Sequence, residues 1–263
     1  MRMQTTGLAL GGGAARGWAH IGVIRALVEK NIRITHIAGT SIGAFVGAFV
    51  ATGTLAVLER ELQVFDWKHG LSYFASVPSK TGMLNGRKIS EFLELHLGAG
   101  RLEETSIPLS TVAVDLRSGR EVTFSTGNII EAVRASIAVP GIFTPVKKEE
   151  MFLADGGLVN PVPVNTVRRM GAERVIAVDL NRVSIAADAS MLKNNDPNLL
   201  DIIGASANII QAGLTRSRLA VDPPDVLIRP PLAHITFVDF NRGEECIELG
   251  YRAAMESLTG HGI

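Results

Sequence analysis

Short apolar runs alternate with segments of helical periodicity along the whole chain. Apolar runs bounded by turn residues predict strands, and they occupy 6–10, 32–38, 109–116, 120–124, 151–154, 174–180 and 225–230. Apolar residues at helical spacing predict helices over 15–30, 128–137, 199–220 and 241–258. This repeated strand–helix–strand order predicts an α/β fold, a three-layer α/β/α sandwich around a mostly parallel central sheet.

One pair of strands breaks the parallel pattern. The runs 109–116 and 120–124 flank the turn "RSGR", which predicts an antiparallel hairpin. No repeat or linker divides the 263 residues, so we expect one domain over 1–263. Two segments look like excursions from it: 66–88 carries aromatic residues among glycines and lysines, and 181–198 is polar.

Composition narrows the classes of function. The 26 basic and 26 acidic residues balance, so net charge does not point to nucleic acid. The single cysteine, Cys246, excludes an internal disulfide and a cysteine-based zinc site. It also suits a reducing compartment, and we expect a cytoplasmic protein.

The stretch 34–58 carries no Asp, Glu, Lys or Arg, and Gly39, Gly43 and Gly47 have the spacing of packed membrane helices. The turn "GTSIG" with its two hydroxyls interrupts the stretch. We therefore interpret it as a buried strand, a tight turn and a buried helix.

The first predicted strand ends in the glycine turn of "LALGGGAARGWAHIGV". A dinucleotide site would place an acidic residue at the end of the next strand to hold the ribose, and "IRITHIAGTS" contains none. A P-loop would need Gly-Lys-Ser or Gly-Lys-Thr, which is absent from this turn. The turn is thus a poor candidate for binding a nucleotide.

The second predicted strand ends in Gly39-Thr40-Ser41-Ile42-Gly43, which matches the G-x-S-x-G nucleophile elbow. A serine on a sharp strand-to-helix turn needs small neighbours on both sides. Adjacent parallel strands bring both turns to one sheet edge, so the amides of Gly11, Gly12 and Gly13 can face Ser41 as an oxyanion hole. Arg16 is a candidate for a positive charge at the same site.

An activated serine needs a proton acceptor, and the residues leave two candidates. The chain order of α/β-hydrolases points to His234, which lies in the apolar "PLAHITFVDF". Asp155 ends a predicted strand, and Gly156 and Gly157 follow it and expose it at a loop.

"GGGAARG", "GTSIG" and "DGG", in this order, together with "RASIAVPGIFTPV" and "NPVPV", resemble the patatin-like phospholipase family. The motif-bearing core covers 7–165, and 166–263 completes the sheet and outer helices. The tail "PPDVLIRPPLAHITFVDFNRG" is similar to the bacterial RssA-like branch. The aspartate motif is D-G-G here, a form that the family uses beside D-G-A.

The resemblance implies that Ser41 is the nucleophile, with Asp155 as its base and no histidine. It also implies that Gly11, Gly12, Gly13 and Arg16 form the oxyanion site, and that neither a metal nor another cofactor takes part. The implied reaction is hydrolysis of carboxylic esters of phospholipids or other lipids through an acyl-serine.

The implied partner is therefore a lipid or ester substrate, and the oligomeric state stays open. The loop 66–88 is a candidate for transient contact with a membrane, which would make the protein peripheral. The alternatives are a lipid-binding regulatory protein of the same fold with little turnover, and an α/β-hydrolase that uses Ser41 and His234.

Overall fold

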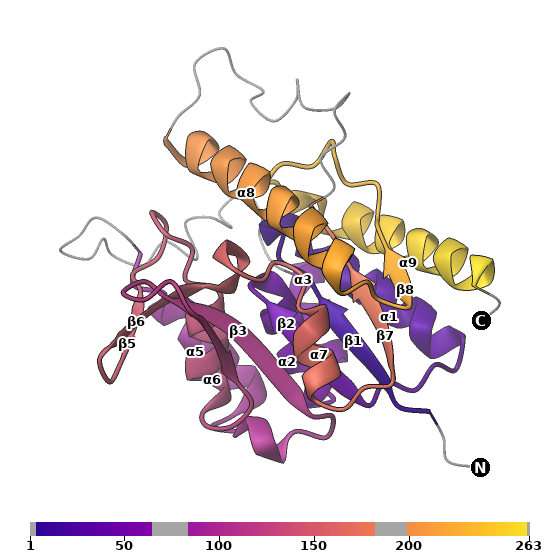
Figure 1. The fold of residues 1–263 in the computed structure, drawn as a ribbon, viewed down its shortest axis with the longest axis horizontal. Coiled ribbons are helices and arrows are strands. Elements are labelled where there is room, and N and C mark those ends of the chain that lie inside the picture. The colour runs from indigo at the N-terminus through magenta and orange to yellow at the C-terminus, as the bar shows by residue number, and fades with distance from the viewer. Residues whose placement is uncertain (1–3, 65–83, 182–198, 262–263) are drawn as a thin grey trace.

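The computed structural model describes residues 4–64, 84–181 and 199–261. An eight-stranded sheet runs through the middle of the molecule (Figure 1), with strand order β5-β6-β3-β2-β1-β7-β8 and β4 paired to β3. The strands are β1 Thr6–Leu10, β2 His36–Thr40, β3 Leu109–Asp115, β4 Glu121–Phe124, β5 Val146–Lys148, β6 Met151–Asp155, β7 Arg174–Val178 and β8 Val226–Ile228.

The strands from β3 through β2, β1 and β7 to β8 are parallel, whereas β4, β5 and β6 add antiparallel pairs. The predicted hairpin is therefore confirmed as β3–β4, and the sheet is mixed but mostly parallel. The helices are α1 Ala19–Glu29, α2 Ile42–Ala51, α3 Leu55–Val64, α5 Arg87–Leu97, α6 Ile129–Ser136, α7 Val164–Arg169, α8 Leu199–Val221 and α9 Gly243–Gly260.

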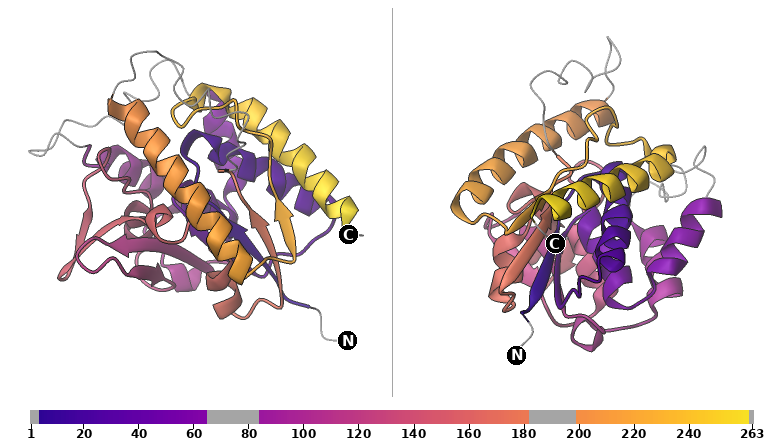
Figure 2. Two further views of the ribbon diagram at one scale, coloured as in Figure 1. Left: turned by 45° about the horizontal axis from the view of Figure 1, so that its top comes forward. Right: turned by 90° about the vertical axis from the view of Figure 1, so that its right-hand side faces the viewer.

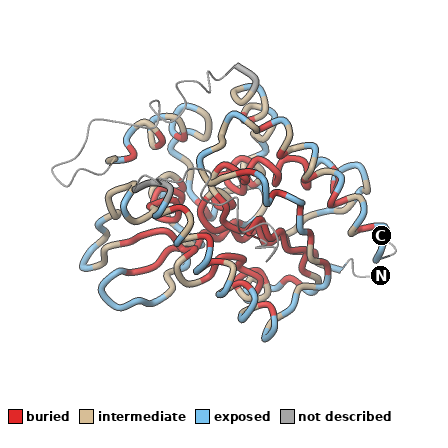
Figure 3. The backbone as a smooth tube through the Cα atoms, turned by 90° about the horizontal axis from the view of Figure 1, so that it is seen from above, coloured by how far each residue is buried: buried red, intermediate tan, exposed pale blue. Residues whose placement is uncertain are grey.

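Helices cover both faces of the sheet (Figure 2), and side chains that alternate along the strands pack against them. In β1, Leu8 and Leu10 join the larger core cluster, which contains residues of α1, α2, α5, α6 and α9. Ala9 points the other way into a smaller cluster, which contains residues of α7 and α8. The most buried backbone accordingly lies in the middle of the molecule (Figure 3).

Most predicted elements are present, with shifts at their ends. The stretch 34–58 is confirmed as a strand, a turn and a buried helix, with α3 beginning inside its end. The predicted strand over 32–38 starts only at His36, because its pairing with β1 begins there, opposite Gly7. The excursion 66–88 lies outside the described residues up to residue 83, and so does 182–198.

The register of β3 places two strand ends side by side. Val112 of β3 pairs with Thr40 of β2, and the next residue, Ala113, pairs with Asp155 of β6. Since β4 pairs with both of these β3 residues on one side, β2 and β6 must share the other side. They approach each other from opposite directions and stop at adjacent positions.

Helices α1 and α9 pack closely through glycines. A Cβ added at Gly22 of α1 would overlap the carbonyl oxygen of Ile247 in α9, and one at Gly250 of α9 would overlap the carbonyl of Ala19. The close approach holds the C-terminal helix against the helix that follows the glycine turn.

We expect Gly22→Ala to lower the free energy of unfolding by about 1–3 kcal/mol, because the added methyl group must push the two helices apart. Gly213→Ala is the matched control, since Gly213 lies in α8 and an added Cβ meets nothing within 4 Å. The control should raise stability by up to about 1 kcal/mol through helix propensity. Urea denaturation of both variants checks this, and a Gly22→Ala protein as stable as the wild type would contradict the packing.

Candidate active site

Ser41 sits in the turn between β2 and α2 with φ 56° and ψ −125°. A non-glycine residue in this region carries strain of about 1–3 kcal/mol and persists only when its surroundings hold it. Its backbone N–H donates a 2.9 Å hydrogen bond to Ser136 Oγ, and the Ser136 hydroxyl donates to the carbonyl of Val112 at 2.6 Å. Ser136, at the end of α6, therefore ties the turn to β3.

The residues on either side of this turn must be small. A Cβ at Gly43 would overlap the carbonyl oxygen of Leu10, and one at Gly39 would overlap that of Gly43. The glycines of the G-x-S-x-G pattern thus allow the first turn of α2 to lie directly against the end of β1.

Ser41 and Asp155 meet at the adjacent ends of β2 and β6. The Ser41 hydroxyl donates a 2.5 Å hydrogen bond to Asp155 Oδ2, and Gly157 N–H donates to Oδ1 at 2.7 Å. Asp155 is 2% exposed. This burial raises the pKa of the carboxyl to about 6, although the bonds from Ser41 and Gly157 oppose the shift.

The two glycines after Asp155 also have close neighbours. A Cβ at Gly156 would overlap the carbonyl of Val112, and one at Gly157 would overlap the Nε2 atom of Gln211 in α8. The D-G-G sequence thus lets the chain turn between β3 and α8.

The glycine turn lies beside Ser41, since a Cβ added at Gly12 would be 3.5 Å from the Cβ of Ser41. Its three amides differ in their availability. Gly11 N–H donates to Val178 O at 3.1 Å, and Gly12 N–H donates to Pro161 O at 2.9 Å. The Gly13 N–H has no acceptor among the described residues, so it is the donor of the three that is available to a ligand.

Arg16 is buried within the fold. Its Nη1 donates to Leu180 O at 3.2 Å and to Asn208 Oδ1 at 3.3 Å, and burial lowers its pKa to about 10. These bonds tie the turn to the end of β7 and to α8, and none of them reaches Ser41.

Neither His20 nor His234 takes part in the Ser41 hydroxyl bond. His20 Nε2 is 2.8 Å from Gly11 O, and because a carbonyl only accepts, Nε2 carries the proton. Burial lowers the His20 pKa to about 4, so the ring is neutral near pH 7. The His234 side chain is half exposed and its Nε2 lies 2.8 Å from Glu245 of α9.

Three buried polar residues at this site were not identified from the sequence: Ser136, Asn181 and Gln211. Asn181 was assigned to the polar loop, and Gln211 was an unremarked position in an amphipathic helix. That helix, α8, is inverted: it buries Asn208, Gln211 and Thr215 and exposes Ile202, Ile209 and Ile210. Its periodicity alone could not show which face packs inward.

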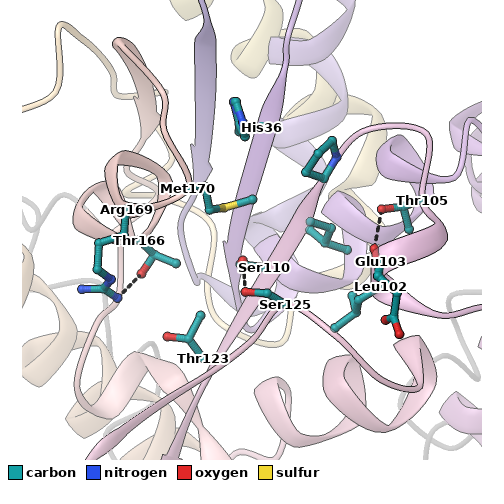
Figure 4. Close-up of a pocket in the computed structure, with 12 residues that line it drawn as sticks. His36, Leu102, Glu103, Thr105, Ser110, Thr123, Ser125, Thr166, Arg169 and Met170 are labelled. Carbon is teal, nitrogen blue, oxygen red and sulfur yellow. Dashed lines mark hydrogen bonds between the residues drawn. The ribbon is translucent and has the colours of Figure 1, made fainter.

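A hollow of about 560 Å³ lies at the opposite end of the strands, near His36 and Leu109, against α7 (Figure 4). Two of its hydroxyls, those of Ser110 and Ser125, lie 2.7 Å apart, and the Thr166 hydroxyl accepts from Arg169 Nη2 at 3.2 Å. Since Ser41 follows the other end of β2, this hollow is separate from the serine site.

In the described part of the chain, no group of three or more His, Cys, Asp or Glu side chains is arranged to hold a metal ion. None of the helices described is both long enough and apolar enough to cross a bilayer.

We expect the buried carboxyl of Asp155 to make stability depend on pH. Its pKa of about 6 in the folded state exceeds the value of about 3.9 in an unfolded chain. The folded state therefore binds the proton more tightly, and the free energy of unfolding should fall by up to about 3 kcal/mol as pH rises from 4 to above 6. Asp155→Asn should remove this slope and be more stable than the wild type at pH 7. Urea denaturation between pH 4 and 7.5 checks it, and parallel curves for the two proteins would contradict it.

Comparisons with known proteins agree with this architecture. Residues 8–168 match the family model described as patatin-like phospholipase. An uncharacterized NTE family protein of Mycobacterium tuberculosis is 38% identical over 192 residues, 73% of this chain and 52% of that protein. Lysophospholipase NTE1 of Pyricularia oryzae is 26% identical over 279 residues, 97% of this chain and 18% of that protein.

The crystal structure of VipD from Legionella pneumophila is similar in fold, with a TM-score of 0.54 at 14% identity, covering 99% of this chain and 67% of that one. The chain spans about half the length of the mycobacterial relatives that it matches. Since the family model matches more than half of the chain, in a range that includes Ser41 and Asp155, the chain belongs to the patatin-like phospholipase family.

Proposed function

We propose that this chain is a serine lipid acyl hydrolase that cleaves carboxylic esters with Ser41 as nucleophile and Asp155 as base. The observation that carries the proposal is the buried 2.5 Å hydrogen bond from the Ser41 hydroxyl to Asp155 Oδ2. A nucleophile within hydrogen-bond reach of a base is the arrangement that covalent catalysis requires. The family and the lysophospholipase name of the Pyricularia oryzae relative support a lipid ester as the substrate.

The reaction follows from these positions. Asp155 accepts the hydroxyl proton as Ser41 Oγ attacks the ester carbonyl, and the carbonyl oxygen becomes an oxyanion. Collapse expels the alcohol, which takes the proton from Asp155, and leaves an acyl-serine. Water then attacks the acyl group, Asp155 accepts a water proton, and collapse returns a proton to Ser41 Oγ and releases the fatty acid.

The developing oxyanion needs hydrogen-bond donors that are already in place. We assign this role to the Gly13 N–H, because the N–H groups of Gly11 and Gly12 already donate to the carbonyls of Val178 and Pro161. The N-terminus of α2, which begins directly after Ser41, adds a favourable dipole. In this proposal Arg16 holds the glycine turn rather than the substrate.

The membrane contact expected from 66–88 stays a prediction, because most of that segment lies outside the described residues. The alternative, a regulatory protein that binds lipid without turnover, would have the same fold. Assays of ester hydrolysis separate the two functions.

We expect Ser41→Ala and Asp155→Asn each to reduce ester hydrolysis by at least about a hundredfold, since a base contributes roughly a hundred- to ten-thousandfold. The double variant should be little worse than either single one, because the two residues act as a unit. Turnover of p-nitrophenyl esters and of lysophospholipids measures the losses, and circular dichroism verifies the fold.

His234→Ala is the control and should lose at most a few-fold, since His234 pairs with Glu245. A folded but inactive His234→Ala protein, beside an Asp155→Asn protein that still turns over, would refute the assignment of the base.

We also expect activity to depend on ionised Asp155. Because burial raises its pKa to about 6, kcat/KM should level off above pH 7 and fall about tenfold per unit below pH 6. An exposed aspartate would lose activity only near pH 3.9. A histidine base would also make kcat/KM fall near pH 6, in the range expected for Asp155. The pH profile is therefore recorded for His234→Ala too, and the fall in kcat/KM on the acid side of the profile is called the acid limb. Loss of the limb in that variant would contradict the role of Asp155.

A further inference from the structure

Asn181, three residues after the end of β7, contacts the glycine turn. Its side chain is 2% exposed. Nδ2 donates to the carbonyl of Gly12 at 3.0 Å and to Oε1 of Gln211 at 2.7 Å. Both partners accept at these atoms, so the NH₂ end of the carboxamide must face them and its orientation is fixed by chemistry. The opposite atom, Oδ1, is buried without a partner among the described residues.

Holding a carbonyl also fixes the amide that follows it. In a trans peptide, the C=O of one residue and the N–H of the next are coplanar and point in opposite directions. The Gly12 carbonyl and the Gly13 N–H belong to one such unit, so the bond from Asn181 sets the direction of the Gly13 N–H. A glycine pair has little intrinsic preference to hold that plane by itself.

The unit before it is held in a different way. The Gly11 carbonyl accepts from His20, and the Gly12 N–H donates to Pro161. The Gly12–Gly13 unit, in contrast, has Asn181 at its carbonyl end, and its N–H meets no acceptor in the part of the chain that the structure describes. Among the described residues, Asn181 is therefore the side chain that holds this unit.

Gln211 in turn holds Asn181. This residue of α8 is 5% exposed. A Cβ at Gly12 would lie 3.4 Å from its Oε1, and a Cβ at Gly157 would overlap its Nε2. One carboxamide thus spans the gap between the glycine turn and the residues that follow Asp155.

We propose that Asn181, held by Gln211, is a positioning residue that aims the Gly13 N–H at the oxyanion formed at Ser41. This inference rests on the proposed hydrolase function. In this role neither Asn181 nor Gln211 needs to touch the substrate. We call the two hydrogen bonds of Asn181, to Gly12 and to Gln211, the clamp. Loss of the clamp should lower kcat and leave KM nearly unchanged, because the hydrogen bond from the Gly13 N–H to the substrate oxygen strengthens only as the oxyanion forms.

The test uses the full chain and p-nitrophenyl butyrate. Asn181→Leu and Gln211→Met keep approximate volume but remove the donor and the acceptor of the clamp. We expect kcat to fall about 10- to 100-fold in each, with KM within about twofold, as expected for misplacement of a catalytic donor. Asn165→Leu is the matched control and should keep kcat, since Asn165 lies on α7 and bonds to Asn160.

Gln211→Glu separates hydrogen bonding from packing. A carboxylate oxygen still accepts from Asn181, so the plateau kcat should stay within about threefold of the wild type. The added charge near Asp155 should move the acid limb of the pH profile upward. If Gln211→Met and Gln211→Glu lose kcat equally, the clamp is refuted, and this pair decides the question even if Asn181→Leu fails to fold.

Ser41→Ala in the same assay distinguishes the two proposals. An active Ser41→Ala protein would refute the hydrolase mechanism itself. An inactive one, beside Asn181→Leu and Gln211→Met proteins with wild-type kcat, would refute only the positioning role.

Discussion

The meeting of two strands along β3 is the constraint on which the site depends. β2 reaches Val112 from one direction and β6 reaches Ala113 from the other, and neither can continue. The chain must turn away at both ends at once, and the residues at these turns are Ser41 and Asp155. The 2.5 Å bond between their side chains follows from this register. The carbonyl of Val112 also accepts from Ser136, which holds the Ser41 turn.

A layer of buried polar groups surrounds this meeting point. His20 and Asn181 each hold one carbonyl of the glycine turn, while Arg16 ties the following turn to β7 and α8. Glycine amides can approach a ligand closely, but a glycine chain is conformationally free. The surrounding side chains therefore supply the rigidity that the turn itself lacks. This explains why α8 turns polar residues inward.

Apart from β5, which no predicted run covers, local pattern predicted the strands, the elbow and the hairpin, because each depends on neighbours in sequence. It placed the start of the second strand at Ile32, since apolar alternation does not reveal where the pairing with β1 begins. It left Asp155 and His234 open as base, because the choice depends on the pairing of β3 with β6. Asn181 and Gln211 were missed because a buried carboxamide has no sequence signature. The two hydrogen-bond partners of Asn181, Gly12 and Gln211, lie 169 and 30 residues away from it in the chain.

The surroundings of Asp155 have a consequence for how charge moves. Its hydrogen bonds come from Ser41 and Gly157, and no cation contributes to its pKa shift. A serine–histidine pair creates an ion pair when the proton transfers, whereas a serine–carboxylate pair transfers an existing negative charge from Asp155 to the substrate oxygen. No new pair of opposite charges then forms during acylation. Such a site needs hydrogen-bond donors at the Asp155 carboxylate and at the substrate oxygen rather than a counter-ion. Backbone amides in a buried pocket can supply donors at both positions.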